Sequence, residues 1–415
     1  MADWQEISGS VTAPKGFRAA GIAAGLKPSG ASDLALIVSD VAAIAAGVFT
    51  LSQVRAACVD YCRQQLQSRA SARAILCNAG QANAGTGDRG WADARESAQL
   101  ISQALNIPLE SVLLASTGVI GQRIRMEPLR QGIVPLVNAL SAEDTGGDAA
   151  AKAIITTDLV TKSIALETTI DDRPVRIGGI AKGSGMIHPN MATMLAFVTC
   201  DAAVSSSLWQ QMLQRAANRS FNQITVDGDT STNDALIALA NGQSRTPAIT
   251  SEGPAAEKLE AMLTAVCRHL ARAIARDGEG ATCLLEVRVS GAPDEKAACQ
   301  VAKTIAGSSL VKSAVFGRDP NWGRIAGAAG RAGVSFDQGD LTIELGKFLL
   351  MDAGQPLEFD RDAASTYMRR AAAGTYLKGD TVAINVCIGD GSGTGTAWGC
   401  DLSYDYVKIN AEYTT

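Results

Sequence analysis

Short apolar and β-branched runs alternate with amphipathic helical patterns along this chain, and that alternation limits its fold more than any other feature. Strand-like runs occupy residues 35–38, 74–77, 112–115, 194–199 and 283–289. Between such runs, one apolar helix face is formed by Leu259, Met262, Leu263, Val266, Leu270 and Ile274. Strands that alternate with covering helices predict an α/β fold.

A stretch rich in Gly, Ala and Pro, near residues 290–294, is the expected boundary between two domains. It separates a main domain, residues 1–290, from a smaller C-terminal α/β domain, residues 291–415. Within the second domain, residues 381–388 and 398–407 are predicted to be paired strands. A polar tail of a kind that usually frays then ends the chain.

The balance of charged and apolar side chains excludes several classes of protein. Of the 415 residues, 47% are hydrophobic, which is enough to bury a large core and excludes a disordered or fibrous chain. The net charge is −5 at pH 7, so no bulk attraction to nucleic acid or to an anionic membrane is expected. The most apolar run, residues 41–51, is about half a membrane span, and Asp3 and Glu6 do not suit a secretory signal. We expect a soluble, cytoplasmic protein that acts on small molecules.

The nine cysteines are an odd number scattered through a long chain, which favours a reducing compartment over a disulfide framework. Cys58 and Cys62 have the spacing of a metal pair, but they fall within an expected helix at residues 52–70. No second pair of Cys or His lies near them in the sequence. We interpret both as structural thiols and expect no metal site.

Three glycine-rich segments, residues 118–121, 179–185 and 389–395, raise the possibility of a phosphate site. None has the Lys and Ser/Thr of a P-loop, or the strand, helix and distant acid of a dinucleotide fingerprint. A nucleotide-binding module is therefore a weak alternative. The third segment is interpreted as a flexible strand connection near the surface, because glycine tolerates positive φ.

The acidic segment at residues 227–234 could suggest a calcium loop. An EF-hand loop needs Gly at its sixth position and Glu at its twelfth, where this chain has Thr232 and Ala238. We interpret the segment as a strand-to-helix turn whose Asp, Ser and Asn side chains cap backbone N–H groups.

Only two histidines, His188 and His269, are available to a His-dependent nucleophile. His269 lies beside the apolar helix face, where a packed or surface role is expected, whereas the position of His188 is less easily dismissed. An N-terminal Thr needs no His, because its own α-amine accepts the hydroxyl proton. Glycines and a proline precede Thr193, which would allow strained internal cleavage there, although a Gly-rich turn into a strand explains them equally well.

Residues 182–195, with the sequence KGSGMIHPNMATML, resemble the self-cleaving site of the ornithine acetyltransferase / glutamate N-acetyltransferase family of arginine biosynthesis. The resemblance extends along nearly the whole chain. Further family-like blocks are residues 116–121 (STGVIG), 156–158 (TTD), 220–222 (SFN), 227–234 (DGDTSTND), 277–282 (DGEGAT), 317–324 (GRDPNWGR) and 399–410 (GCDLSYDYVKIN).

The resemblance implies autoproteolysis of the Ala192–Thr193 bond, which yields an α chain and a β chain that begins with Thr193. Thr193 is then the nucleophile, with its α-amine as general base. It takes the acetyl group from N-acetyl-ornithine and passes it to glutamate in ping-pong transfer. Thr117 and Gly118 match the family's oxyanion-binding positions.

The family's substrate contacts correspond to Thr156, Lys182, Thr193, Glu279, Asn410 and Thr415. Lys182 suits an α-carboxylate and Glu279 a cationic amine, while Thr156, Asn410 and Thr415 offer neutral hydrogen bonds. The last two imply that the polar C-terminal tail returns to the active site. His188 lies in the motif at a position where the family tolerates other residues, so we expect it to be non-catalytic.

The resemblance also implies a layered αββα sandwich with the cleavage point in its main domain, and an assembly of two α and two β chains. No metal or bound cofactor is implied. Whether acetyl-CoA is a second donor is left open by the sequence. The nearest alternative is an N-terminal-nucleophile amidase or aminopeptidase of the same fold, in which water resolves the acyl-enzyme.

Overall fold

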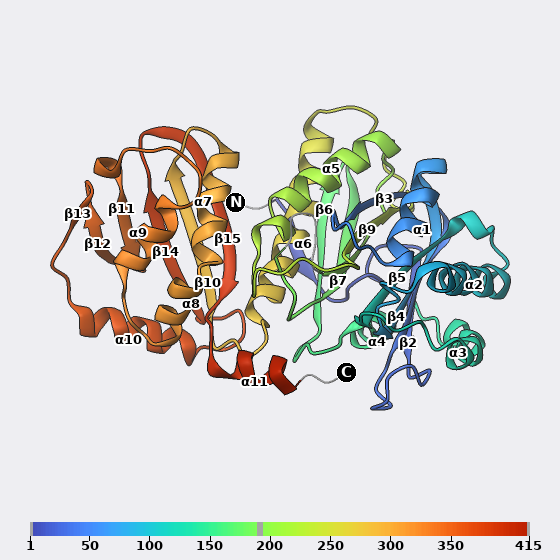
Figure 1. The fold of residues 1–415 in the computed structure, drawn as a ribbon. Coiled ribbons are helices and arrows are strands. Elements are labelled where there is room, and N and C mark those ends of the chain that lie inside the picture. Colours follow the sequence, from blue (N-terminus) through green and yellow to red (C-terminus); the bar gives the residue numbers. More distant parts are fainter. Residues whose placement is uncertain (1–2, 189–193, 413–415) are drawn as a thin grey trace. The chain divides into compact units, whose positions relative to one another are not determined.

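Two units divide the chain, and each contains its own sheet (Figure 1). The computed structural model describes residues 3–188 and 194–412. Each unit collects segments that are distant in sequence: the first comprises 1–183, 189–222 and 229–270, and the second comprises 184–188, 223–228 and 271–415. Residue 290, the expected domain boundary, lies inside the second unit, in the strand Leu284–Gly291.

The described strands of the first unit form one mixed sheet in the order β1-β6-β7-β8-β9-β3-β4-β5, with β2 beside β3. Their bounds are β1 (Gln5–Ile7), β2 (Phe17–Ile22), β3 (Leu34–Phe49), β4 (Ser71–Gln81), β5 (Val112–Val119), β6 (Lys162–Ile170), β7 (Arg173–Lys182), β8 (Leu195–Cys200) and β9 (Ala235–Ala240). Four of the expected strands coincide with parts of β3, β4, β5 and β8. Strand β3 serves both halves of the sheet, because its start pairs with β2 and β4 and its end with β9.

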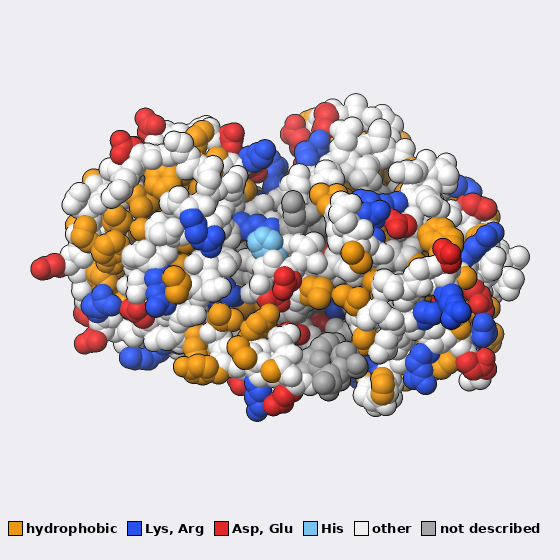
Figure 2. Space-filling view, in the orientation of Figure 1, with side chains coloured by type: hydrophobic (Ala, Val, Ile, Leu, Met, Phe, Trp, Pro, Cys, Tyr) orange, Lys and Arg blue, Asp and Glu red, His pale blue; other side chains and the backbone are white. Residues whose placement is uncertain are grey.

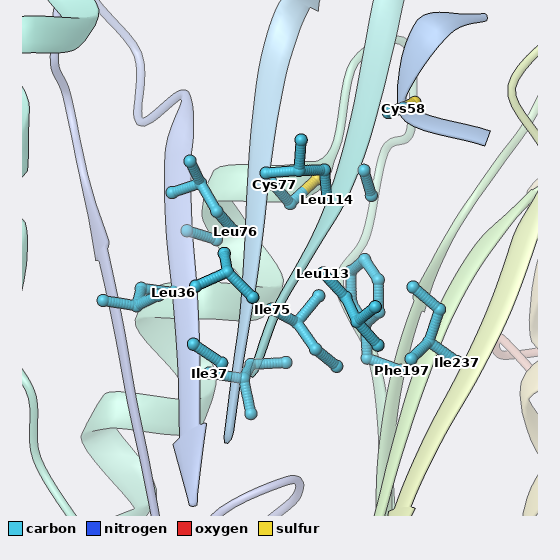
Figure 3. Close-up of a cluster of buried hydrophobic side chains, with 14 of the residues drawn as sticks. Leu36, Ile37, Cys58, Ile75, Leu76, Cys77, Leu113, Leu114, Phe197 and Ile237 are labelled. Carbon is cyan, nitrogen blue, oxygen red and sulfur yellow. The ribbon is translucent and has the colours of Figure 1, made fainter. Parts of the chain in front are cut away.

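One face of β8 and β9 packs against β4 and β5 in a single buried cluster. Alternate residues along a strand point to the same face, and the cluster follows that rule with Leu195 and Phe197 of β8 and Ala235, Ile237 and Leu239 of β9. Figure 3 shows Phe197 and Ile237 close to Ile75 and Leu113 of the facing strands. The two halves of the sheet are therefore stacked layers with the core between them.

Helices cover the outer faces of both layers. On one side, α1 (Ala57–Ser68) and α2 (Gly87–Leu105) pack on β5, and α3 (Met126–Asn138) and α4 (Asp144–Ile154) pack on β2. On the other side, Trp209 of α5 (Ser206–Asn218) donates to the Ala238 carbonyl of β9. Gly179 of β7 lies against Leu270 of α6 (Pro254–Arg276), whose predicted apolar face is buried. The expected αββα arrangement is confirmed.

The described strands of the second unit form a sheet in the order β13-β12-β11-β14-β10-β15. Its strands are β10 (Leu284–Gly291), β11 (Thr342–Leu345), β12 (Phe348–Asp352), β13 (Gln355–Pro356), β14 (Thr381–Cys387) and β15 (Gly391–Cys400). Its helices are α7 (Glu295–Ala306), α8 (Ser309–Phe316), α9 (Trp322–Gly330), α10 (Arg361–Ala372) and α11 (Tyr404–Glu412).

The predicted pairing of residues 381–388 with 398–407 is wrong. Strand β10 lies between β14 and β15, parallel to the first and antiparallel to the second. Only residues 398–400 of the later segment are strand, and a helix begins at Tyr404. Local alternation identifies a strand but not its neighbour, which here comes from about a hundred residues earlier in the chain.

The glycines at 391, 393 and 395 are part of β15, not of a flexible connection as we expected. A Cβ on Gly391 would lie 2.1 Å from the Ala292 carbonyl oxygen, and one on Gly393 would lie 2.3 Å from that of Asp294. A Cβ on Gly395 would lie 2.5 Å from the Cys299 amide nitrogen. These glycines allow the start of α7 to pack directly on the strand.

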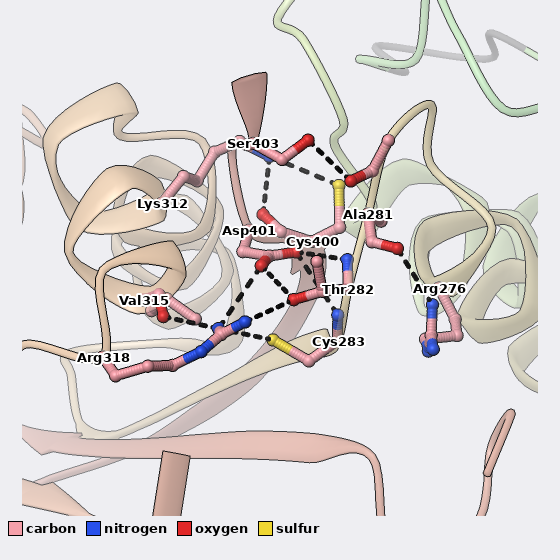
Figure 4. A network of polar contacts seen from close by, with 11 residues as sticks. Arg276, Ala281, Thr282, Cys283, Lys312, Val315, Arg318, Cys400, Asp401 and Ser403 are labelled. Atoms are coloured by element: carbon pink, nitrogen blue, oxygen red, sulfur yellow. Dashed lines mark hydrogen bonds and ion pairs between the residues drawn. The ribbon is translucent and has the colours of Figure 1, made fainter. Parts of the chain in front are cut away.

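Asp401, directly after β15, joins the start of β10 to the end of β15 in the second unit (Figure 4). Its buried carboxylate accepts hydrogen bonds from the N–H groups of Thr282 at 2.8 Å and Cys283 at 3.3 Å. Arg318 contacts the same carboxylate at 3.4 Å. Two residues further on, the Ser403 hydroxyl accepts the Tyr406 N–H at 3.3 Å, next to the start of α11 at Tyr404.

The visible surface carries both signs of charge. Figure 2 shows Lys and Arg side chains interspersed with Asp and Glu over the face in view. Across the described residues, no helix combines the length and apolar character needed to cross a membrane.

Candidate active site

Thr117 and Gly118, the expected oxyanion positions, lie at the carboxyl end of β5. This strand runs parallel to β4, with Gly118 opposite Gly80. The two glycines have φ values of +128° and +120°. A Cβ on Gly118 would lie 2.3 Å from the carbonyl carbon of Gly80, so the close approach of these strand ends requires glycine.

The outer edge of β5 is covered by thiols of α1. The Leu114 N–H donates to Cys62 Sγ at 3.1 Å. Cys58 lies against the amide and hydroxyl of Ser116, and burial raises the pKa of its thiol to about 11. Both cysteines are buried, which suits the structural role predicted for them. Alternate residues present their backbone groups at the same strand edge, so the next amide along this edge belongs to Gly118.

Lys182, at the end of β7, joins two further predicted residues. Its Nζ donates to Thr117 Oγ1 at 3.1 Å and to Thr156 Oγ1 at 3.0 Å. The Lys182 side chain is 11% exposed. Three residues from three separate segments thus form one cluster, in which a cation and two hydroxyls suit an anionic group.

The Asp158 carboxylate holds this cluster in place. Burial alone would raise the pKa of its carboxyl, but Lys182 at 4.0 Å and Lys162 at 2.7 Å, with the Gly183 N–H, outweigh burial and hold that pKa well below its usual value. Asp158 also accepts the Thr156 N–H at 3.0 Å. It therefore holds both Thr156 and Lys182, a role that the TTD block at 156–158 indicated only as a family match.

The acidic segment at 227–234 ends in two buried side chains, Asn233 and Asp234, that sequence reasoning did not assign to the site. The segment leads into β9 and not into a helix as we expected, because residues 235–240 are all buried and pair on both sides. Burial raises the pKa of the Asp234 carboxyl well above its usual value, although the Met194 amide and Lys182 act in the opposite direction. Asp234 is thus a buried carboxyl beside the start of β8.

The second unit holds two more of the predicted substrate contacts together. Asn410 of α11 donates from Nδ2 to Glu279 Oε2 at 2.9 Å. A Cβ on Gly185 would lie 2.5 Å from the Glu279 carboxylate, so the family motif passes directly over this acid. His188 Nδ1 lies 2.9 Å from Thr225 Oγ1, a contact that suits a structural histidine.

Three predicted residues, Ala192, Thr193 and Thr415, lie outside the described residues. The strand expected immediately after the cleavage point is present, since β8 begins at Leu195 and the Met194 carbonyl accepts the Ala235 N–H at 3.1 Å. Within residues 3–188 and 194–412, no cluster of three or more His, Cys, Asp or Glu side chains could hold a metal ion.

A family model described as the ArgJ family matches residues 18–415. The chain belongs to the ArgJ family. It is 78% identical over 415 residues to the arginine biosynthesis bifunctional protein ArgJ 1 of Nostoc sp., and 75% identical over 415 residues to ArgJ of Synechocystis sp.. Both alignments cover 100% of this chain and 100% of the relative. The ArgJ crystal structure from Bacillus halodurans is 44% identical, with a TM-score of 0.49, and the match covers 52% of this chain and 98% of that one. The resemblance seen in residues 182–195 is confirmed by the ArgJ match.

Proposed function

We propose that this ArgJ-family chain transfers the acetyl group of N-acetyl-L-ornithine to L-glutamate in arginine biosynthesis, through an acetyl ester on Thr193. The two relatives that match over their full length are named as arginine biosynthesis proteins, which supports the pathway. The structural observation that carries the proposal is the cluster in which Lys182 holds the hydroxyls of Thr117 and Thr156 at 3.1 and 3.0 Å. This cluster lies beside the strand end that bears Gly118.

The first step is cleavage of the Ala192–Thr193 bond. The Thr193 hydroxyl attacks the Ala192 carbonyl, the C–N bond breaks, and the nitrogen takes up a proton to become an α-amine. Water then hydrolyses the ester and releases the Ala192 carboxylate. The new α-amine is the base that the nucleophile needs for transfer.

Transfer then takes place in two halves. The Thr193 hydroxyl, losing its proton to the α-amine, attacks the acetyl carbonyl of the donor, and ornithine leaves with a proton. The amine of glutamate attacks the resulting ester, forms N-acetyl-glutamate and returns the proton to Thr193. The acetyl group is conserved because the ester reacts with an amine in a site from which water is excluded.

The negative oxygen that forms in both halves needs hydrogen-bond donors. We assign these to the Thr117 hydroxyl and the Gly118 amide at the edge of β5. The positive Lys182, 3.1 Å from Thr117 Oγ1, adds favourable charge at the same place.

We assign the substrate-binding residues to substrate groups according to charge. Lys182 suits the α-carboxylate that both substrates carry, and Glu279 suits a cationic amine. Thr156, Asn410 and Thr415 supply neutral hydrogen bonds. The contact between Asn410 and Glu279 supports the assignment of these two residues to one substrate group.

The relatives are named as bifunctional, which supports a second activity. We propose acetyl-CoA as the second donor, used to acetylate glutamate directly. We further propose that the enzyme works in the cytoplasm without a metal or cofactor, as an assembly of two α and two β chains.

Intact-mass measurement under denaturing conditions, with N-terminal sequencing, tests the proposal. The purified protein should give fragments of about 20 and 23 kDa, the larger beginning at Thr193. Thr193→Ala should remain one chain and transfer nothing. The cleaved enzyme should consume N-acetyl-ornithine rapidly only when glutamate is present. Consumption at the same rate without glutamate would instead identify a hydrolase, and an uncut active chain would overturn the Thr193 mechanism.

A further inference from the structure

Asn233 lies two residues before β9, and its side-chain amide binds backbone groups at the ends of two other strands. Its side chain is buried, with 6% exposed. Its Nδ2 donates to the Ala82 carbonyl at 2.6 Å and to the Ser116 carbonyl at 2.8 Å, and its Oδ1 accepts from Thr232 Oγ1 at 2.6 Å. Two carbonyl acceptors fix which end of the amide is nitrogen.

These two carbonyls belong to the strand ends that form the proposed oxyanion site. Ala82 directly follows β4, and Ser116 directly precedes Thr117 in β5. One amide group therefore holds the ends of both strands at the place where Gly80 and Gly118 come closest.

The edge of β5 explains why this contact bears on chemistry. Leu114 and Ser116 present their backbone groups at this edge to Cys62, Cys58 and Asn233. The amide of Gly118 is the next group along the same edge. Asn233 thus holds the last backbone carbonyl on this edge before the proposed oxyanion donor, so loss of this contact would free the strand end that carries the Gly118 amide.

The residues that follow Asn233 contact the chain just before β8, next to the proposed nucleophile in the sequence. Ala235, two residues further on, donates its N–H to the Met194 carbonyl at 3.1 Å, and Met194 directly follows Thr193 in the sequence. The same short segment therefore contacts the strand end on the oxyanion side and the strand start on the nucleophile side.

We propose that Asn233 is a positioning residue that sets the oxyanion-binding end of β5 relative to the start of β8. The inference rests on the proposed function, in which Thr117 and Gly118 bind the oxyanion. Asn233 touches no reacting atom and acts through the Ser116 and Ala82 carbonyls.

Asn241, at the opposite end of β9, offers a matched control. It is similarly buried, at 8% exposed, and its Nδ2 donates to the Lys15 carbonyl at 2.9 Å. Replacing either Asn with Ala removes a buried amide that binds backbone carbonyls. Comparable losses of thermal stability are expected, but only one of the two supports the strand end at Gly118.

The test compares Asn233→Ala and Asn241→Ala in the full-length enzyme, with cleavage checked by intact mass. For Asn233→Ala we expect kcat to fall about 10- to 100-fold, a part of the roughly 10²–10³ lost with a whole oxyanion donor, while KM for both substrates stays within about 3-fold. Asn241→Ala should keep kcat within about 2-fold. Equal kcat in the two variants would show that Asn233 is only structural and overturn the inference.

Two further measurements keep the result decisive. Asn233→Asp preserves size but offers no N–H, so it should lose kcat as Asn233→Ala does even if the alanine variant folds poorly. Combined with Thr117→Ala, the loss should be less than the product of the single losses, because both act on one strand end. A wild-type kcat in Asn233→Asp, or full multiplicativity, would contradict the inference. A wild-type enzyme that transfers no acetyl group would instead refute the proposed function.

Discussion

Replacement of Gly118 by Ala should damage transfer much more than it damages folding. A Cβ at this position would lie 2.3 Å from the Gly80 carbonyl carbon and 2.4 Å from its oxygen. Since Cβ contacts below 3.0 Å are essentially never found, β4 and β5 must separate by about 0.7 Å at their ends, because close-packed backbone cannot absorb the clash otherwise.

That displacement is large compared with the tolerance of a hydrogen bond. An N–H···O distance of about 2.9 Å would become about 3.6 Å, which no longer counts as a hydrogen bond. Loss of one oxyanion donor costs about 10²–10³ in kcat, or roughly 3–4 kcal/mol. The φ of +128° adds a stability cost of about 1–3 kcal/mol for a residue with a Cβ.

Gly121→Ala is the control. Gly121 lies three residues further on with φ of +82°, and a Cβ there would meet no atom within 4 Å. It should show only the stability cost of the positive φ in thermal unfolding, without the cost of the backbone clash, and keep kcat within about 3-fold. The assay compares kcat for steady-state transfer from N-acetyl-ornithine to glutamate, measured on cleaved protein of both variants. Gly118→Ala with near-normal kcat, or Gly121→Ala with an equal loss, would refute the reasoning.

Three other substitutions test separate parts of the site. Because the pKa of Asp158 is lowered in the folded chain, its charge stabilises the fold above the usual carboxyl pKa of about 4 and ceases to do so as the pH falls through the lowered value. Asp158→Asn should therefore cost about 3–5 kcal/mol in urea unfolding at pH 7 and less at pH 3, and an equal cost at both would contradict the charged pair. Glu279→Gln should raise KM for ornithine-type substrates about 10- to 100-fold with cleavage unchanged, since one charged hydrogen bond is lost; unaltered KM would remove Glu279 from the amine site. His188→Ala should leave cleavage and transfer near normal, and a folded variant without transfer would restore a His-based mechanism.

The sequence predicted the layers of the fold better than the pairing within them. Alternating and helical periodicity identified four strands of the first unit and the buried face of α6, because burial of one face leaves a local pattern. The order β14-β10-β15 leaves no such pattern, since a strand's neighbour depends on the path of the whole chain. The pairing expected for residues 381–388 failed for that reason.

The sequence likewise predicted some residues of the candidate site and missed others. The family resemblance brought Thr117, Thr156 and Lys182 into the prediction, and the structure places them in one hydrogen-bonded cluster. Asp158 and Asn233 were not assigned roles. Besides its local partners Thr156 and Lys162, Asp158 binds Gly183, 25 residues away, and Asn233 binds Ser116, 117 residues away. These distant contacts are encoded by no local spacing.

The rate at which the thiols along β5 are alkylated can report how often this strand edge opens. Thiolate is the form that alkylating reagents attack, and burial raises the pKa of both Cys58 and Cys62. Alkylation at neutral pH must therefore wait for α1 to part from β5, so its rate measures how often that edge opens. A ligand that tightens the strand end beside Gly118 should slow the labelling of these two cysteines, which would give a direct reading of site rigidity without any turnover.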